Sequence, residues 1–435
     1  MWPFRREQSS SVRSSSPYWL LRNGIGDAQE HCPLPESCDI AIIGAGITGA
    51  LVGDALVATG ARIVILDADE PGQGSTAAST ALLQYEIDTH LTDLTARFGA
   101  ERATLAYRAC LESFRLLEQR FPDLLGRADY DRRGSLYLAA GERALPALRA
   151  EFAARSAIGI DCEWIDESRL ARRFGCRRPG GILSARGAQI DPLRLTRALL
   201  AGCARHGVEV RTRSRVVAID DAGDLLALRL ESGGTLQARH VVVCAGYESL
   251  EFLPQSLADV HNTFALVTEP VDDPAVATMP LIWETARPYL YMRATADHRL
   301  IVGGADVPFK NAGARELLLP RQIRQLAKGY SDLFGRELPP IAYTWAGSFA
   351  ETADGLPYIG PAPGLPPRLQ FALCYGGNGI TYSVHAGDIV RAHLEGRAHA
   401  LDEVFGFGRS GAEPARFVQA KEESGDPPRS GSTAG

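Results

Sequence analysis

The chain has 435 residues, which is enough for two domains and a large hydrophobic core. Its 45% hydrophobic and 23% charged residues are typical of an ordinary globular protein, and its net charge of −6 gives no reason to expect nucleic acid as a partner. No apolar run approaches the roughly 20 residues that span a bilayer, so we expect no integral membrane segment. The eight cysteines are scattered, without metal-ligand spacing, so we expect reduced thiols, no metal site and a cytoplasmic location.

The first sixteen residues contain Arg5, Arg6, Arg13 and many serines. A transit peptide can have this composition, but so can a disordered tail, and we interpret residues 1–16 as a tail. An apolar signal-peptide core is missing there, so we expect no export. Residues 17–21 form a small aromatic and apolar patch, which we expect to dock on the folded body.

The stretch from Cys38 to Asp67 predicts a βαβ unit that binds a dinucleotide. An apolar run, Ile40–Ile43, ends at a glycine, as a buried parallel strand does. In G-x-G-x-x-G, the glycines allow a tight turn, a close approach of pyrophosphate to the backbone, and close packing of helix on strand. The residues that match this motif are Gly44, Ala45, Gly46, Ile47, Thr48 and Gly49. A helix to about Thr59 and a strand, Ile63–Leu66, complete the unit.

Asp67 ends the second strand at the usual spacing for the carboxylate that accepts hydrogen bonds from a ribose. We include the adjoining Ala68 among the cofactor-binding residues. An acid here argues against NADP, whose extra phosphate requires an arginine, and leaves NAD and FAD open. The alternative, a tight βα turn without a ligand, is disfavoured because strand, helix and terminal acid all stand at their expected places.

The loop after this unit, residues 71–81, is rich in small residues and hydroxyls and must begin at the carboxyl edge of the sheet, where ligands bind. Helical periodicity follows over 91–121, with a break near Gly99, and over 142–157. Asp191 caps a helix that ends near Gly207. We expect strands at 134–139, 208–212, 216–219, 226–230, 236–243, 343–347 and 369–373, antiparallel strands over 262–304, and helices at 314–334 and 382–395.

Glycine turns of the cofactor-binding kind recur at Gly44, Gly246 and Gly376–Gly379. A chain that returns twice to its first sheet fits a large, enclosed FAD better than a dissociable NAD. The helix that follows the last turn presents a partial positive charge at its N-terminus, which can stabilise electron density on a ligand.

From about Tyr18 to Gly396 the sequence resembles the D-amino-acid-oxidase-like FAD-dependent oxidoreductases, the group that holds glycine oxidase, sarcosine oxidase and gamma-glutamylputrescine oxidoreductase. The motifs that carry the resemblance are Ile43-Gly-Ala-Gly-Ile-Thr-Gly49, Gly72-Gln-Gly-Ser-Thr76, Arg133-Gly-Ser-Leu-Tyr137, Val241-Val-Val-Cys-Ala-Gly246, Trp345-Ala-Gly347, Asp354-Gly-Leu-Pro-Tyr-Ile-Gly360 and Gly376-Gly-Asn-Gly-Ile380.

The resemblance implies an α/β (α+β) fold: a Rossmann-like FAD-binding domain of the glutathione-reductase type and a discontinuous antiparallel-sheet substrate domain. The FAD-binding domain would comprise 17–130, 190–255 and 345–405, and the substrate domain 131–189 and 256–344. We expect a second disordered tail over 406–435.

The resemblance also implies roles for single residues around a noncovalent FAD. The glycine turn would hold the pyrophosphate and Asp67 the adenosine ribose, and Val216 would meet the adenine through its backbone. The other residues expected to bind the cofactor are Gly74, Ser75, Thr76, Ser79, Thr80, Ala81, Ala245, Gly246, Gly376, Gly377, Asn378, Gly379, Ile380 and Thr381.

Two departures from the family pattern matter. Members often carry Arg-Asn in the loop after the second strand, where this chain has Ala78-Ser79, which changes the local flavin contacts. Amino-acid oxidases such as glycine oxidase carry an arginine two residues after the Trp-Ala-Gly strand to clamp the substrate carboxylate, and this chain has Phe349 there. We therefore predict that a simple α-amino acid is not bound in that manner. Some members bind flavin through a cysteine near that strand, but the matching position is Gly347.

The implied reaction is oxidation of a C–N bond in a small amine or amino-acid-derived substrate, with oxygen or another electron acceptor. Candidates to face the substrate are Tyr289, Tyr291, Arg293 and Glu351, for each of which an ordinary structural role is an equal alternative. Of these, Tyr289, Tyr291 and Glu351 are the predicted catalytic residues. Two other functions stay open: a quinone-linked flavin amino-acid dehydrogenase, and a non-catalytic flavin-binding assembly protein.

Overall fold

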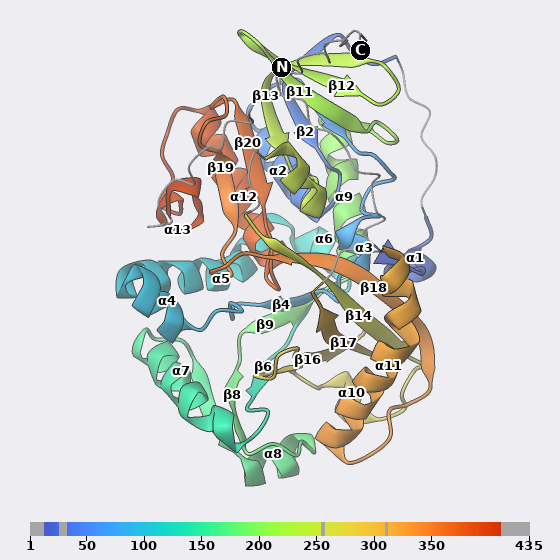
Figure 1. The fold of residues 1–435 in the computed structure, drawn as a ribbon, viewed down its shortest axis with the longest axis vertical. Coiled ribbons are helices and arrows are strands. Elements are labelled where there is room, and N and C mark those ends of the chain that lie inside the picture. Colours follow the sequence, from blue (N-terminus) through green and yellow to red (C-terminus); the bar gives the residue numbers. More distant parts are fainter. Residues whose placement is uncertain (1–12, 26–32, 254–256, 309–311, 410–435) are drawn as a thin grey trace, which may run out of the picture.

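The computed structural model describes residues 13–25, 33–253, 257–308 and 312–409, and its strands form three sheets. The larger two sheets have eight and nine strands. The sheet that contains β2 and β13 lies in the upper half of Figure 1, and the sheet that contains β14 and β17 lies in the lower half. This mixed α/β architecture, parallel at the glycine turn and mainly antiparallel in the second sheet, confirms the predicted fold class. The predicted tail after 409 and most of the tail at 1–16 lie outside the described residues.

The eight-stranded sheet contains the predicted βαβ unit. β2 (Ser37–Ile43) pairs in parallel with β3 (Ile63–Leu66) on one side and with β13 (Thr235–Val243) on the other. The carboxyl ends of these strands are buried, which explains their unbroken apolar runs. The other strands of this sheet are β10 (Glu209–Arg211), β11 (Val216–Ala222), β12 (Leu225–Leu230), β19 (Tyr358–Pro361) and β20 (Leu369–Leu373).

Helix α2 (Ile47–Val57) connects β2 to β3 and packs against α9 (Pro192–Arg205) and α12 (Gly379–Leu394). It is apolar on most of its circumference because it lies between the sheet and these two helices. The Asp191 carboxylate accepts hydrogen bonds from the N–H groups of Leu193 and Arg194, which confirms the predicted helix cap. Other helices on this side are α4 (Leu91–Phe98), α5 (Ala100–Arg120), α6 (Pro122–Arg127) and α13 (Asp402–Phe405).

The nine-stranded sheet is antiparallel except where β15 pairs with β6. Its strand order is β1 (Arg13–Ser14), β18 (Ile341–Glu351), β14 (Asp259–Thr268), β17 (Leu300–Val307), β16 (Leu290–Ala294), β15 (Leu281–Glu284), β6 (Ser135–Leu138), β8 (Gly180–Ser184) and β7 (Cys162–Asp166). Helix α11 (Ala312–Phe334) contacts β14, β17 and β18 and closes a hydrophobic core with them. The predicted strands and helices of this half are therefore present.

Smaller elements connect the two sheets. The third sheet joins β4 (Leu82–Gln84), β9 (Gly187–Gln189) and β5 (Asp131–Arg132). Helix α1 (Tyr18–Asn23) contacts α3 (Ser75–Ala78), α9 and β18, which confirms that the aromatic patch docks on the folded body. The remaining helices are α7 (Leu145–Ala157), α8 (Glu167–Phe174) and α10 (Pro274–Ala277), with 3₁₀ turns at Glu142–Ala144, Gly246–Phe252 and Phe407–Arg409.

Three details differ from the sequence-based expectations. Residues 13 and 14, expected in a disordered tail, form β1 because they pair with Gly347 and Ala346. The segment expected to return to the FAD-binding domain at 345 starts inside β18, which belongs wholly to the nine-stranded sheet. The last helix begins at Gly379 rather than Tyr382, because a glycine-rich run that looks like a turn already has helical geometry. The division into two domains otherwise stays a prediction.

Candidate functional site

The glycine turn between β2 and α2 leaves no room for side chains at its first and third glycines. Gly44 has φ of +107°, and a Cβ there would lie 2.4 Å from the carbonyl oxygen of Cys244. A Cβ on Gly49 would lie 1.9 Å from the carbonyl oxygen of Gly44. At Gly46 the nearest atom to an added Cβ is the Thr76 hydroxyl, at 3.1 Å. The turn is thus a bare backbone cradle at the N-terminus of α2, as a pyrophosphate requires.

Asp67 lies beside this cradle, at the end of β3. Its carboxylate accepts hydrogen bonds from the N–H groups of Ala45 at 2.5 Å and of Asp69 at 2.9 Å. Burial raises the pKa of Asp67 to about 6, against the effect of these two donors. Its carbonyl oxygen accepts from the N–H of Ser214, so Val216, the predicted adenine contact, begins β11 two residues from this point. Cradle and carboxylate fit the pyrophosphate and ribose of a dinucleotide.

The loop of residues 74–81 closes over the cradle. The Thr76 hydroxyl, from α3, accepts a hydrogen bond from the N–H of Ile47 at 3.0 Å. Ser75 lies against the second predicted glycine turn, at Gly246, because a Cβ on Gly246 would approach the Ser75 hydroxyl to 3.3 Å. Ala81 has φ of +55°, a left-handed conformation in which a residue other than glycine is strained. The structure therefore brings the predicted residues of this loop next to both glycine turns.

The last glycine turn reaches the same place from the carboxyl half of the chain. The N–H of Gly377 donates to the Asp88 carboxylate at 2.9 Å, and the Asn378 side chain donates to the carbonyl oxygen of Gln84 at 2.8 Å. Behind it, the hydroxyls of Thr48 and Ser383 are 2.8 Å apart and join α2 to α12. The N-terminus of α12 thus faces the region where the loop 74–81 ends.

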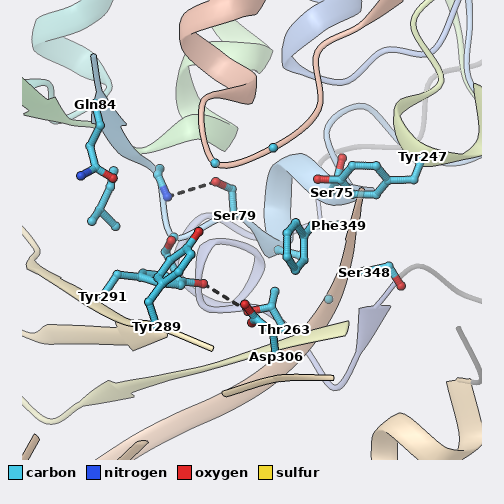
Figure 2. A pocket seen from close by; sticks show the side chains of 17 residues that line it. Ser75, Ser79, Gln84, Tyr247, Thr263, Tyr289, Tyr291, Asp306, Ser348 and Phe349 are labelled. Atoms are coloured by element: carbon cyan, nitrogen blue, oxygen red, sulfur yellow. Dashed lines mark hydrogen bonds between the residues drawn. The ribbon is translucent and has the colours of Figure 1, made fainter. Parts of the chain in front are cut away.

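A pocket opens between these turns and the nine-stranded sheet, and it encloses about 750 Å³ of space, part of it open to solvent (Figure 2). Clefts at the junction of two structural units are common places for small-molecule sites. The residues that line it are Ser75, Ala78, Ser79, Thr80, Ala81, Leu82, Gln84, Tyr247, Thr263, Tyr289, Tyr291, Asp306, Gly347, Ser348, Phe349, Gly376 and Gly377. Predicted cofactor residues and predicted substrate-facing residues therefore share one pocket.

The predicted catalytic residues do not all reach this pocket. Tyr289 and Tyr291 line it; the Tyr289 hydroxyl donates to the Asp88 carboxylate at 3.2 Å, and the Tyr291 hydroxyl is 3.3 Å from that of Thr263. Glu351 is not among the described lining residues, because β18 carries it past the pocket to its last position. Arg293 is buried away from the pocket and donates to backbone carbonyls.

Asp306 is a pocket residue that the sequence analysis misses. Its carboxylate lies in the pocket wall near Tyr289 and Tyr291 (Figure 2). Burial raises its pKa to about 6, the hydrogen bond with Thr263 lowers it and the charge of Asp88 raises it. One of its oxygens is buried without a hydrogen-bond partner among the described residues. In the sequence this acid stands just beyond the region 262–304 expected as antiparallel strands and so resembles an ordinary loop residue, whereas β17 extends to Val307 and includes it.

Three further features of the described residues concern membranes, metal ions and the substrate. None of the described helices is both long enough and apolar enough to cross a bilayer. The part of the chain that the structure describes holds no group of His, Cys, Asp and Glu suited to a metal ion, and its seven cysteines are free thiols. Phe349, which stands where an arginine clamp is expected, lines the pocket and packs against the His261 ring.

Comparison with known proteins shows the family. Residues 39–392 match the family described as FAD dependent oxidoreductase (DAO). Gamma-glutamylputrescine oxidoreductase of Escherichia coli K12 is 25% identical over 381 residues, which cover 84% of this chain and 85% of that protein. Glycine oxidase of Geobacillus kaustophilus is 25% identical over 386 residues, covering 84% of this chain and 94% of that protein.

Solved structures show the same fold. The crystal structure of the Geobacillus glycine oxidase superimposes with a TM-score of 0.72 at 21% identity, over 86% of this chain and 100% of that one. L-α-glycerophosphate oxidase from Mycoplasma pneumoniae, solved with FAD bound, gives a TM-score of 0.70 at 15% identity, over 83% of this chain and 95% of that one. The bare glycine cradle, the carboxylate at the end of β3 and the matched family together show that this chain belongs to the FAD-dependent oxidoreductases of the DAO family.

Proposed function

We propose that this chain oxidises a carbon–nitrogen single bond of an amine, either primary or secondary. The observation that carries this proposal is the charge of the pocket wall. None of its described lining residues is an arginine or a lysine, and one of them, Asp306, is a half-buried carboxylate. Such a wall favours a cation and disfavours the carboxylate of a simple α-amino acid.

Phe349 supports the same substrate class. It stands where the family resemblance expects an arginine that holds a substrate carboxylate, and its ring lines the pocket instead. The charge of Arg287 acts on Asp306, but its side chain donates to the carbonyl oxygen of Asp88 at 3.0 Å and lies over the Tyr289 ring, and it is not among the described lining residues. The phenol rings of Tyr289 and Tyr291 give the pocket an apolar, electron-rich wall that suits the carbon chain of an amine and its cation.

The residues around the pocket fit a noncovalent FAD. The cradle of Gly44–Gly49 would hold the pyrophosphate, Asp67 the ribose, and Ser79, Thr80 and Gly376–Thr381 the flavin. When bound, FAD supplies an acceptor for two electrons and a proton as hydride. The N-terminus of α12 carries the partial positive charge that stabilises added electron density at this edge.

The net change balances without a metal or a second cofactor. Loss of a hydride from the carbon and a proton from the nitrogen converts the amine to an imine, and water then hydrolyses the imine to a carbonyl compound and an amine. The two electrons pass on to oxygen or another acceptor. The role of this chain's residues is to bind, orient and desolvate the amine beside the flavin site.

The test is to mix the purified, FAD-bound protein with single compounds in the absence of oxygen. Reduction of the flavin is measured as the loss of its visible absorbance. We expect diamines and secondary amines to bleach the flavin, and glycine and D-alanine to leave it oxidised. Bleaching by glycine and not by any amine would overturn the proposal. A protein that cannot be reconstituted with FAD would contradict the cofactor assignment itself.

The variant Phe349→Arg sharpens this test. An arginine placed in the pocket should repel a cationic amine and offer a bidentate partner to a carboxylate. We expect the KM for the best amine to rise about tenfold and measurable bleaching by glycine or D-alanine to appear. Phe349→Leu is the matched control, because it changes the side-chain volume without adding charge. It should raise the amine KM much less and give no activity on glycine.

A further inference from the structure

Three side chains from distant parts of the chain donate hydrogen bonds to three of the four carbonyl groups of residues 78–81. The indole N–H of Trp345 donates to the carbonyl oxygen of Ala78 at 2.9 Å, and the indole N–H of Trp19 to that of Ser79 at 2.7 Å. The guanidinium of Arg293 donates to the carbonyl oxygen of Ala81 at 2.7 Å. Each of the three donors is at least 97% buried. These carbonyl oxygens therefore accept hydrogen bonds from distant side chains rather than from the backbone of a sheet or helix.

The loop they hold is part of the pocket wall. Ala78, Ser79, Thr80 and Ala81 all line the pocket, on the side of the glycine turns. With the three carbonyls turned toward the buried donors, the Ser79 hydroxyl accepts a hydrogen bond from the N–H of Ala81 at 3.0 Å. The left-handed conformation of Ala81 is maintained against its intrinsic preference. Residues 79–81 belong to no helix or strand, so they keep one conformation only if such contacts stabilise it.

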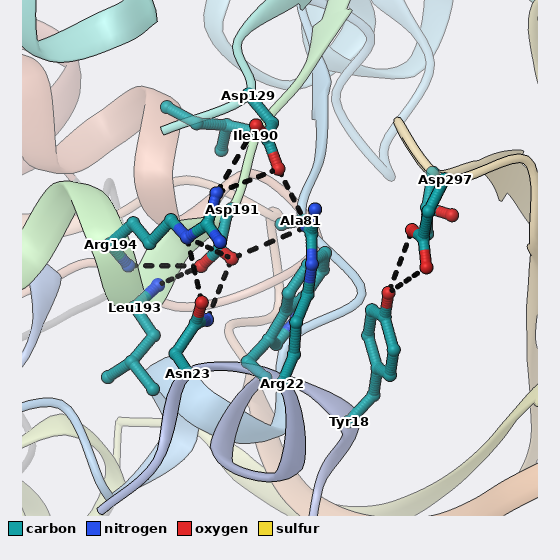
Figure 3. A network of polar contacts seen from close by, with 12 residues as sticks. Tyr18, Arg22, Asn23, Ala81, Asp129, Ile190, Asp191, Leu193, Arg194 and Asp297 are labelled. Atoms are coloured by element: carbon teal, nitrogen blue, oxygen red, sulfur yellow. Dashed lines mark hydrogen bonds and ion pairs between the residues drawn. The ribbon is translucent and has the colours of Figure 1, made fainter. Parts of the chain in front are cut away.

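One of the three donors comes from α1, a helix of six residues near the start of the described chain. Figure 3 shows how this helix is fastened independently of Trp19. The Tyr18 hydroxyl donates to the Asp297 carboxylate at 2.9 Å, and the Arg22 guanidinium pairs with Asp129 at 2.7 Å. The Asn23 amide donates to the Asp191 carboxylate at 2.8 Å. These bonds secure both ends of α1, so its docking does not depend on the indole N–H.

Trp19 also contacts Arg293, another of the three donors. The Arg293 guanidinium lies 5.2 Å from the centre of a Trp19 ring and donates to the carbonyl oxygen of Ile190 as well as to Ala81. Burial lowers the pKa of Arg293 to about 9, so this cation is kept in the interior at a cost in stability. Retention of a buried cation and two indole donors at one short loop indicates that the conformation of this loop matters for more than packing.

We propose that Trp19 of the N-terminal helix α1 is a positioning residue for FAD: its indole N–H fixes the Ser79 carbonyl and so holds residues 79–81 in the conformation that receives the flavin. The proposal depends on the FAD site and not on which amine is oxidised. Without this bond the loop samples other conformations, and FAD binds only the competent fraction, so its apparent dissociation constant rises in proportion.

The test is Trp19→Phe, which removes the N–H and keeps an aromatic ring. We expect the dissociation constant for FAD, measured by titration of apoprotein, to rise about tenfold, and the visible circular dichroism of the bound flavin to change. Trp164→Phe is the matched control, because the Trp164 indole nitrogen is buried without a hydrogen-bond partner among the described residues. It should leave both readouts as in the unaltered protein.

A second variant separates positioning from general docking of α1. Tyr18→Phe removes the hydrogen bond with Asp297, which fastens the helix but does not touch the loop. We expect this variant to lower the thermal stability slightly and to bind FAD nearly as tightly as the unaltered protein. Equal loss of FAD affinity in both variants, or unchanged FAD binding in Trp19→Phe, would overturn the proposal. Neither readout requires turnover, so failure here is distinct from failure to find an amine substrate.

Discussion

Two carboxylates at the site are held in environments that disfavour their charge. Burial raises the pKa of both Asp67 and Asp306 to about 6. Asp67 lies beside the nucleotide cradle, and Asp306 lies in the pocket where Tyr289 and Tyr291 approach it. Asp67 has two backbone N–H donors, whereas one Asp306 oxygen has no hydrogen-bond partner among the described residues, so the Asp306 carboxylate is better explained by a ligand that its charge attracts.

The variant Asp306→Asn should separate the cost of this carboxylate to stability from its contribution to substrate binding. Folding raises the pKa from 3.8 to about 6, so the penalty for the charged form is absent below pH 3.8, grows between the two values and is complete above pH 6. The variant should therefore be more stable than the unaltered protein at pH 8, by up to about 3 kcal/mol, and equally stable near pH 3.5. Denaturant unfolding at the two pH values measures this difference.

The same variant should bind a cationic amine less well. We expect its KM to rise about 10- to 100-fold at pH 8, because a hydrogen bond to a charged group is lost. Asp224→Asn, at an exposed hairpin between β11 and β12, is the control and should change neither stability nor KM appreciably. A less stable Asp306→Asn protein with an unchanged KM would show that this carboxylate serves the fold and not the substrate.

At the level of elements, the turn between β2 and α2 depends on contacts that only glycine allows. Gly49→Ala places a Cβ 1.9 Å from the Gly44 carbonyl oxygen, so the turn must open. We expect a loss of about 1–3 kcal/mol in unfolding free energy and protein purified largely without flavin. Gly202→Ala on α9 is the control, because its Cβ would meet only the end of Arg205, at 3.7 Å, and alanine favours a helix. Full flavin content in Gly49→Ala would contradict the role of the turn.

Elements with a local signal could be predicted from the sequence, and contacts between distant segments could not. The strand–glycine–helix unit at Cys38–Asp67 and the cap at Asp191 are encoded by neighbouring residues, and both are present. Asp306 and Trp19 have no such signal, because their roles depend on which loop the folded sheet brings against them. Glu351 ends β18 and is not among the described lining residues, although the charge of Asp306 acts on it, so its catalytic role stays a prediction.

At the scale of the whole molecule, the site is assembled from segments that are far apart in the chain. The Gly44 turn, the loop at 74–81, Gly246 and the turn at 376–379 all come from the eight-stranded sheet and its connections, while Asp306 and Phe349 come from the nine-stranded sheet. The loop carbonyls held by Trp345 and Arg293, both on the nine-stranded sheet, join the two halves at the pocket. A ligand that fills this junction should therefore stabilise both halves together.

Hydrogen exchange with and without FAD tests this coupling. We expect FAD to slow amide exchange in the Gly44 turn, the loop at 74–81, the turn at 376–379 and α1 together, because ligand binding to the folded state shifts every opening that releases the ligand. Exchange at β7, on the far edge of the nine-stranded sheet, should change little and serves as the internal control. Protection confined to the Gly44 turn would mean that the nucleotide is held there alone, and that the loop and α1 are not part of the cofactor site.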